Sequence, residues 1–349
     1  MYKILTVSSV ISHFPVLVFL VFTVISHSAF SDVKLMVLRP TQKHLGFIIP
    51  VREGRNLHDE INLYKKNIQT NLDLRKVISD QQLDQLSLGQ VYQLPKTESP
   101  KVLALANRGY DYESNPMGAG RNRIEKFREK LNANIAMYIL PVAIANYLNA
   151  TETLEFYSAL SSHFSGVIAL GGADVTPEIY DEPLKEGRDV NLSRDRYEIN
   201  FLSYWIQNKK GFLYGVCRGH QLISAALGFK LIQHISDHGD GIWEKHHILT
   251  KPTQSKVFDR IFATKANNFL VNSYHHQAVI YQNQVNPEIE VAATDLHGTV
   301  ESLSSRDGRI FTTQFHPEFM NGYVSKRLFT YLSAKLMMSN PVYSCKQLF

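Results

Sequence analysis

Short apolar runs alternate with helix-like patterns from Lys101 to about Gly228, and this alternation restricts the fold more than any other feature of the chain. The runs at 102–106, 136–141, 166–170 and 212–216 are almost entirely apolar, as expected of strands buried on both faces. The stretches between them carry helical periodicity. This pattern predicts an α/β fold, an open and mostly parallel sheet with helices on both faces.

The rest of the chain divides around this region. After Gly228 the pattern becomes richer in strands, and an amphipathic helix is expected at about 323–338. Residues 32–100 carry leucines and isoleucines at helical spacing, which predicts one or two helices and a linker of unknown role. A pro-segment, a packing extension and a docking surface all fit them. We therefore expect four parts: 1–31, a targeting segment; 32–100, an extension, predominantly helical; 101–340, the catalytic domain; and 341–349, a tail.

The first part has the layout of a secretory signal peptide. A basic start at Lys3 precedes an apolar stretch that is densest at 16–25, and small residues surround Ala29. Ten dense residues are fewer than the roughly 20 that a spanning helix needs. The sequence predicts an exported protein cut before Asp32; an anchor formed by residues 4–25 is the alternative.

The amino-acid composition excludes several classes of protein. The chain is 44% hydrophobic and 20% charged, which excludes a disordered protein, and its net charge of +5 is too small and too dispersed to indicate nucleic-acid binding. Only Cys217 and Cys345 occur, which excludes a disulfide scaffold and a four-cysteine zinc site.

Cys217 lies in the pattern Gly215-x-Cys217-x-Gly219, between an apolar run and a helical stretch. This is the cysteine form of a nucleophile elbow, in which glycines on both sides relieve crowding in a tight strand-to-helix turn. The N-terminus of the following helix favours a thiolate, and the N–H of Arg218 can bind an oxyanion. A buried, inert cysteine is the alternative. Cys345 has no comparable context.

Two further loops follow apolar runs. His316 and Glu318, after the run at 310–315, supply a base and a partner that orients it. Gly171 and Gly172, after the run at 166–170, let backbone N–H groups approach a substrate and offer a second oxyanion donor. Because ligands of open α/β sheets bind at the carboxyl ends of strands, the three loops are expected to meet.

Taken together, these motifs resemble those of proteins with the class I glutamine amidotransferase (flavodoxin-like) fold. More narrowly, it resembles the peptidase C26 family of γ-glutamyl hydrolases and γ-glutamyl-γ-aminobutyrate hydrolases. Matching stretches keep family order over roughly 100–340, and the family's Ala-Gly-Gly-x-Pro pattern is replaced at 133–141. They are GGADVTPEIY (171–180), RDRYE (194–198), GVCRGHQ (215–221), VNSYHHQAV (271–279), ATDLHGTVES (293–302) and QFHPE (314–318).

The resemblance implies a triad of Cys217, His316 and Glu318, with oxyanion binding near Gly172 and Arg218. It also implies a γ-glutamyl pocket bordered by the following residues: Gly171, Gln221, Ser273, Tyr274 and His275. The expected activity is hydrolysis of a γ-glutamyl amide through a thioester on Cys217, with a small γ-glutamyl molecule as substrate. No nucleic acid or stable membrane partner is expected, and a homodimer is compatible with the sequence.

Two other functions stay open: a glutaminase component that passes ammonia to a synthetase, and a non-catalytic binding protein on the same fold. The expected export, and a chain without a recognisable synthetase domain, favour hydrolysis. His234 and His238 are four residues apart, and His246 and His247 follow, but Gly239 and Gly241 indicate a loop and no motif completes a zinc site. The sequence therefore predicts no metal and no cofactor. The basic residues of 121–130 fit a solvated helix face, or a site for substrate carboxylates.

Overall fold

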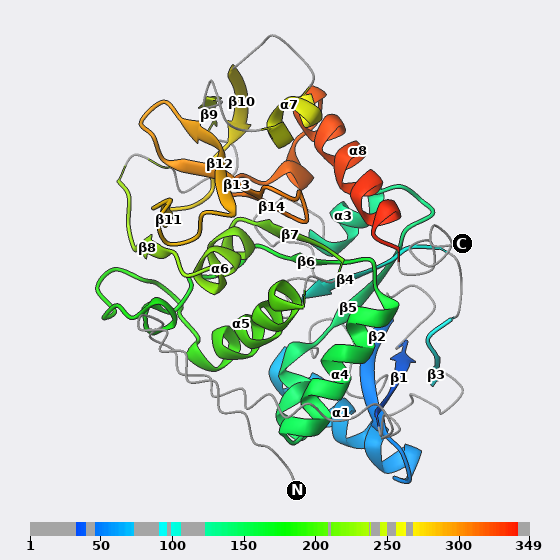
Figure 1. Ribbon diagram of the computed structural model, residues 1–349. Coiled ribbons are helices and arrows are strands. Elements are labelled where there is room, and N and C mark those ends of the chain that lie inside the picture. The colour runs from blue at the N-terminus through cyan, green and yellow to red at the C-terminus, as the bar shows by residue number, and fades with distance from the viewer. Residues whose placement is uncertain are drawn as a thin grey trace, which may run out of the picture.

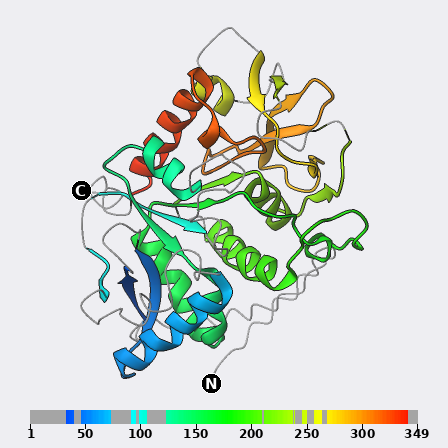
Figure 2. The same cartoon turned by 180° about the vertical axis from the view of Figure 1, so that it is seen from behind.

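A computed structural model gives the fold of the chain (Figures 1 and 2). It describes residues 33–39, 46–72, 91–95, 99–105, 123–208, 211–236, 238, 245–249, 256–262 and 268–340. The expected targeting segment, the tail and Cys345 lie outside these ranges. Within them, no helix combines the length and the apolar character needed to cross a bilayer.

One large sheet runs through the described residues, in the order β10-β9-β12-β13-β14-β7-β6-β4-β5-β2-β1-β3. Its middle, from β14 to β2, is parallel, and the strands on either side of that block pair antiparallel. This is the predicted open, mostly parallel α/β sheet. The parallel strands are β2 (Phe47–Arg52), β4 (Lys101–Leu105), β5 (Ala136–Leu140), β6 (Gly166–Ala169), β7 (Phe212–Val216) and β14 (Ile310–Thr313).

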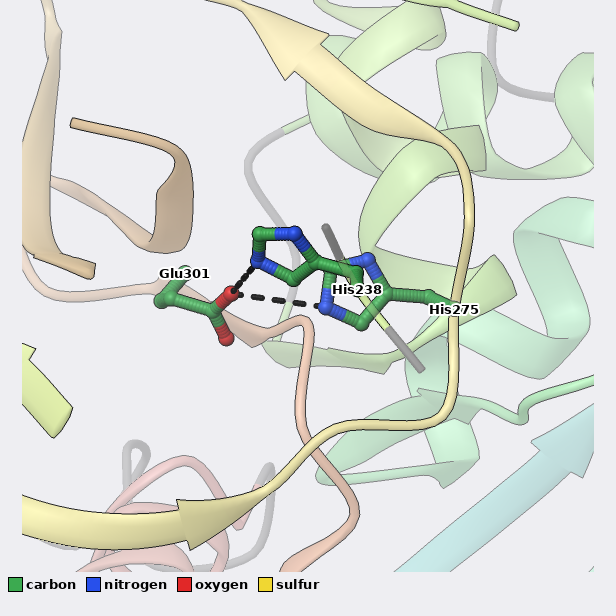
Figure 3. Close-up of side chains that lie close together, drawn as sticks. All are labelled: His238, His275 and Glu301. Atoms are coloured by element: carbon green, nitrogen blue, oxygen red, sulfur yellow. Dashed lines mark ion pairs between the residues drawn. The ribbon is translucent and has the colours of Figure 1, made fainter. Parts of the chain in front are cut away.

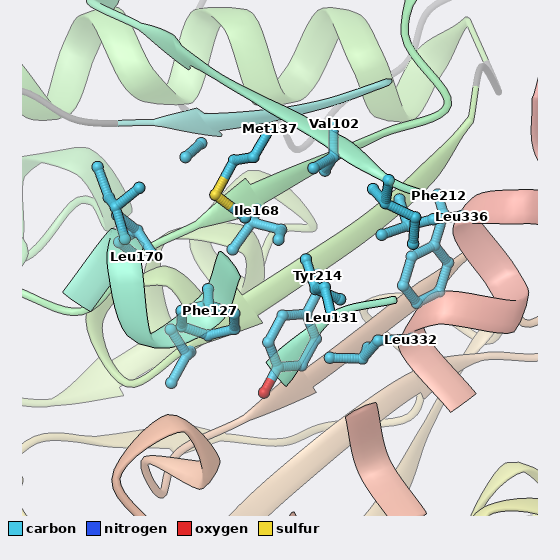
Figure 4. Packing of buried hydrophobic residues seen from close by; sticks show 14 of the residues in the cluster. Val102, Phe127, Leu131, Met137, Ile168, Leu170, Phe212, Tyr214, Leu332 and Leu336 are labelled. Carbon is cyan, nitrogen blue, oxygen red and sulfur yellow. The ribbon is translucent and has the colours of Figure 1, made fainter. Parts of the chain in front are cut away.

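Helices cover both faces of the sheet, which explains why the central strands are apolar throughout (Figure 1). On one face Phe127 packs on Tyr214, with ring centroids 6.0 Å apart, and Leu332 and Leu336 belong to the same cluster (Figure 4). That face carries α1 (Leu57–Leu72), α3 (Arg123–Lys130), α7 (Lys256–Phe262) and α8 (Tyr323–Met338). The opposite face carries α4 (Ala150–His163), α5 (Leu192–Gln207) and α6 (Arg218–Ala226).

The predicted strand-rich portion after Gly228 extends the sheet beyond β14. Short turns join its last two strands to each other and to β14, and a separate two-stranded sheet is also present. Asp295, at the end of one strand, fixes a turn by accepting hydrogen bonds from the backbone of His297 and Thr299. The strands are β9 (Lys245–Leu249), β10 (Asn268–Asn272), β12 (Ile289–Asp295) and β13 (Val300–Ser305), with β8 (Lys230–Ile232) and β11 (Ala278–Ile280) in the small sheet.

The extension at 32–100 differs from its predicted helical character. It does contain α1, but β1 (Val33–Leu38), β2 and β3 (Val91–Gln93) are strands of the main sheet. Pro50 inside β2 weakened the strand signal, because proline cannot donate to a ladder. The strand accommodates it because β2 pairs with β5 only at Phe47. Buried side chains of β1 and β2 join both hydrophobic clusters of the catalytic portion, so this segment shares its core.

Three short 3-10 turns complete the described structure. They are η4 (Val142–Tyr147), η5 (Pro177–Tyr180) and η6 (Pro317–Phe319). The last of these begins directly after His316 and contains Glu318. The strands β6, β7 and β14 are neighbours and parallel, so the loops that follow them, with Gly171, Cys217 and His316, emerge at one edge of the sheet.

Candidate active site

Cys217 occupies a strained turn between β7 and α6. Its φ is 52° and its ψ is −108°, a region that non-glycine residues rarely adopt, and the residue is the N-cap of α6. A Cβ on Gly215 would lie 2.6 Å from the carbonyl oxygen of Gly219, and one on Gly219 would lie 2.0 Å from that of Ala169. Both glycines are therefore needed for the turn to form, which is the arrangement that the sequence pattern predicted.

The base reaches Cys217 from β14. Thr313 pairs in parallel with Val216, and its carbonyl accepts the Cys217 backbone N–H at 2.8 Å, so the residues that follow both strands lie together. His316 is fully buried, and its Nδ1 lies 2.7 Å from Oε1 of Glu318. A carboxylate only accepts at neutral pH, so Nδ1 carries the hydrogen and Nε2 is the atom left for the nucleophile.

Charge at the site favours a protonated imidazole. Burial lowers the pKa of the His316 ring, but the Glu318 carboxylate and the Cys217 sulfur beside it outweigh burial and raise it to about 9. Cys217 lies beside this imidazole, at the N-terminus of α6. At neutral pH the pair is therefore arranged as a nucleophilic sulfur next to a proton donor.

Asn272, at the end of β10, holds the base in place. Its Oδ1 accepts the His316 backbone N–H at 2.8 Å, and its Nδ2 donates to the His316 carbonyl at 2.9 Å. The sequence predicted that Ser273, Tyr274 and His275 border the pocket, but it did not assign this role to Asn272. The available signal was the position of this asparagine at the end of an apolar run, directly before the predicted pocket residues.

The oxyanion side of the site is formed by the loop after β6 and the first turn of α6. Gly171 lies against the triad, since a Cβ there would be 2.8 Å from the His316 ring and 3.5 Å from Cys217 Cβ. Its carbonyl accepts a hydrogen bond from Arg123 at 3.3 Å, so this residue of the basic run points inward. Gly172 lines the pocket with Cys217, and Arg218 opens α6, where N–H groups lack intrahelical acceptors.

The Arg218 side chain ends in a buried network of four charges. It forms ion pairs with Asp195 and Glu198, and Arg194 donates to Glu198 at 2.9 Å. Burial raises the pKa of Glu198, but the two guanidinium groups outweigh it and lower it to about 2. Asp195 also accepts from the backbone and hydroxyl of Thr176. Through this network, α5 and the loop after β6 contact Arg218, the residue that follows Cys217.

A pocket of about 220 Å³ lies over Cys217. Of the residues that the resemblance assigned to substrate binding, Gln221, Tyr274 and His275 line it, and the Tyr274 carbonyl lies 3.8 Å from the sulfur. Gly171 is placed behind it, against the triad. Ser273 is only 1% exposed and is not among the lining residues.

The outer part of the pocket carries charges of both signs that the sequence left unassigned. Asp174 pairs with His276 at 3.0 Å and accepts the backbone N–H of Arg188, and His276 in turn lies 3.2 Å from His234. Burial raises the pKa of Asp174 in spite of these partners. Arg188 and Asp189 are exposed at the same rim.

The site combines a strained cysteine with a buried histidine–carboxylate pair and with glycine-rich loops at the carboxyl edge of a parallel sheet. This combination defines a class I glutamine amidotransferase-like protein, with a hydrolase or amidotransferase role. The peptidase C26 profile matches residues 123–318, which include the whole candidate triad. The chain belongs to the peptidase C26 family.

Two known proteins are similar in sequence over more than half of this chain. The chain is 30% identical over 222 residues to protein NtpR of Enterococcus hirae, covering 58% of this chain and 90% of NtpR. It is 29% identical over 189 residues to YvdE of Lactococcus lactis, named as glutamine amidotransferase-like, covering 52% of this chain and 73% of YvdE. A glutamine amidotransferase of Thermotoga maritima is similar in structure, with a TM-score of 0.41 and 17% identity, over 70% of this chain and 88% of that one.

Proposed function

We propose that the protein is a γ-glutamyl hydrolase that uses Cys217 as its nucleophile. The observation that carries this proposal is the position of the strained Cys217 at the floor of a pocket, beside the His316–Glu318 pair. Nothing in this arrangement requires a metal or a cofactor for amide hydrolysis, because nucleophile, proton donor and oxyanion donors all come from the chain.

The proposed reaction has two halves. The Cys217 sulfur attacks the γ-carbonyl carbon, and the backbone N–H groups of Gly172 and Arg218 bind the oxyanion. The C–N bond then breaks, the leaving amine takes the proton from His316, and a γ-glutamyl thioester remains. Neutral His316 next removes a proton from water, whose oxygen attacks the thioester carbon. The C–S bond breaks and glutamate leaves, so that the thiolate–imidazolium pair is restored.

The charges of the pocket rim support a γ-glutamyl substrate. Such a substrate carries an ammonium and a carboxylate on its α-carbon, several bonds from the reacting γ-carbonyl. Asp174 and Asp189 suit the ammonium, and the exposed guanidinium of Arg188 suits the carboxylate. The rim therefore complements a zwitterion better than it would a simple apolar amide.

Glutamate release from a small panel of substrates tests the proposal. The purified protein is given glutamine, γ-glutamyl-γ-aminobutyrate and a folate poly-γ-glutamate, and glutamate and ammonia are measured. We expect glutamate from at least one γ-glutamyl amine or peptide. Turnover of glutamine alone would instead favour an ammonia-supplying component, which the amidotransferase-like name of YvdE suggests. No release from any substrate would favour a non-catalytic protein.

The pH dependence of turnover tests the role of Glu318. His316 carries its proton below a pKa of about 9 and loses it above, so kcat/KM is expected to fall as pH rises through about 9. In Glu318→Gln the carboxylate that raises this pKa is gone while burial remains, so the alkaline limb should move roughly 1–3 pH units lower. A uniform loss of rate with an unmoved limb would contradict this role.

A further inference from the structure

A second cluster of histidine and carboxylate side chains includes His275, which also lines the pocket (Figure 3). His238 follows β8, His275 lies in the segment between β10 and β11, and Glu301 belongs to β13. One ligand atom from each lies within 4.8 Å of the others. All three side chains are buried, and Glu301 is completely so. The mechanism proposed above uses neither His238 nor Glu301.

Two of the separations between these atoms are those of ion pairs, and they are also close to the spacing of ligand atoms around a metal ion. Nε2 of His275 lies 3.4 Å from Oε1 of Glu301, and Nε2 of His238 lies 3.7 Å from the same oxygen. Hydrogen bonds of this type have a range of about 2.7–3.2 Å. A tetrahedral zinc ion with bonds of about 2.0–2.1 Å holds its ligand atoms roughly 3.3 Å apart.

The hydrogen bonding of His275 selects the nitrogen that a metal would need. Its Nδ1 lies 3.0 Å from the backbone carbonyl of Gln277, which can only accept, so Nδ1 carries the hydrogen. In the neutral ring the Nε2 lone pair is then directed toward the Glu301 carboxylate. A histidine that donates its second N–H to a backbone carbonyl is the usual arrangement around a metal ligand.

Asp295 supports the cluster from the neighbouring strand. Its Oδ1 accepts backbone hydrogen bonds from His297 at 2.9 Å and Thr299 at 2.7 Å, which fixes the carboxylate. Its Oδ2 lies 3.3 Å from Nε2 of His238. Two buried carboxylates thus face two imidazole nitrogens, and a divalent cation between neutral imidazoles would balance their charge.

We infer that His238, His275 and Glu301 bind a divalent transition-metal ion of the zinc type, with Asp295 as an outer partner or a fourth ligand. The donor set of two imidazoles and a carboxylate suits zinc. The ion would join three elements distant in sequence. It would also fix the 272–277 segment, whose Tyr274 and Gln277 line the pocket, so its role is to hold the pocket wall rather than to react.

Metal binding is measured on the full chain carrying Cys217→Ser, which removes the reactive thiol as a competing zinc ligand. After treatment with a chelator, zinc is titrated by calorimetry and the bound metal is counted by elemental analysis. We expect one zinc per chain. His238→Asn and Glu301→Gln should abolish it, Asp295→Asn should weaken it roughly 10–100-fold, and the exposed His163→Gln should bind as the parent does.

Cobalt absorption keeps the inference testable if those variants fail to fold. Co²⁺ bound to the folded parent by nitrogen and oxygen ligands should give visible d–d bands without a thiolate charge-transfer band, and zinc should displace it. Zinc should also raise the thermal midpoint of the parent. Absence of stoichiometric binding, or equal binding by folded Glu301→Gln, would overturn the inference and leave an ion-paired cluster of imidazolium and carboxylate groups.

Discussion

Cys217→Ala is expected to abolish glutamate release, with a loss in kcat of about 10⁴–10⁶, while the protein stays folded. Without the sulfur no thioester can form, and His316 has no nucleophile to activate. Because alanine keeps the Cβ, the turn at φ 52° retains its geometry, and only one buried sulfur is removed. The oxyanion donors remain, so a small residual rate above that of water alone is compatible with the prediction.

The matched control is the other cysteine. Cys345→Ala should keep the parental rate, because that residue lies outside the proposed mechanism. Rapid quenching of the wild type with substrate, followed by mass spectrometry, should find a γ-glutamyl adduct on the peptide that contains Cys217. Full activity in well-folded Cys217→Ala, or an adduct elsewhere, would rule out the proposed nucleophile.

Glu198→Gln is expected to lower the free energy of unfolding by about 3–5 kcal/mol at pH 7, the typical result of removing one partner from a buried ion network. The side chain is 1% exposed and pairs with both Arg194 and Arg218. Glutamine keeps the shape of the side chain but removes the negative charge that faces both guanidinium groups. Urea unfolding followed by circular dichroism measures the change.

The contribution of Glu198 to the free energy of unfolding should decrease as the pH falls. The folded-state pKa of Glu198 is lowered from 4.5 to about 2, so its stabilisation is complete above pH 4.5 and is lost as pH falls toward 2. The shift corresponds to about 3 kcal/mol. Glu125→Gln is the control, because its ion pair with Arg128 is partly exposed and should change stability by less than about 1 kcal/mol. Equal effects of the two substitutions would contradict the buried network.

The sequence predicted what depends on local pattern. The nucleophile elbow depends on contacts within a few residues, among Gly215, Cys217 and Gly219. The strands from β4 to β7 can be recognised in the sequence as apolar runs. Their adjacency follows from general rules for parallel sheets. The meeting of Cys217 with His316 could therefore be anticipated, although 99 residues separate them.

What the sequence could not specify depends on pairing between distant segments. The strand β2 contains Pro50, and the pairing of β1 and β2 with each other and of β2 with β5 makes them part of the sheet. In the sequence, nothing distinguishes Asn272 and Glu198 from other polar residues. Their roles become visible only in the structure, where Asn272 contacts His316 and Glu198 contacts Arg218. Ser273 was predicted to border the substrate pocket, but its side chain is buried and does not line the pocket.

The separation of β7 from β14 along the chain has a consequence for folding. The two strands pair in parallel, so the base reaches the sulfur only after a contact of long sequence separation has formed, and such contacts form slowly. Until then Cys217 has no histidine beside it. The rate at which Cys217 reacts with an alkylating reagent during refolding would therefore report when β14 pairs with β7.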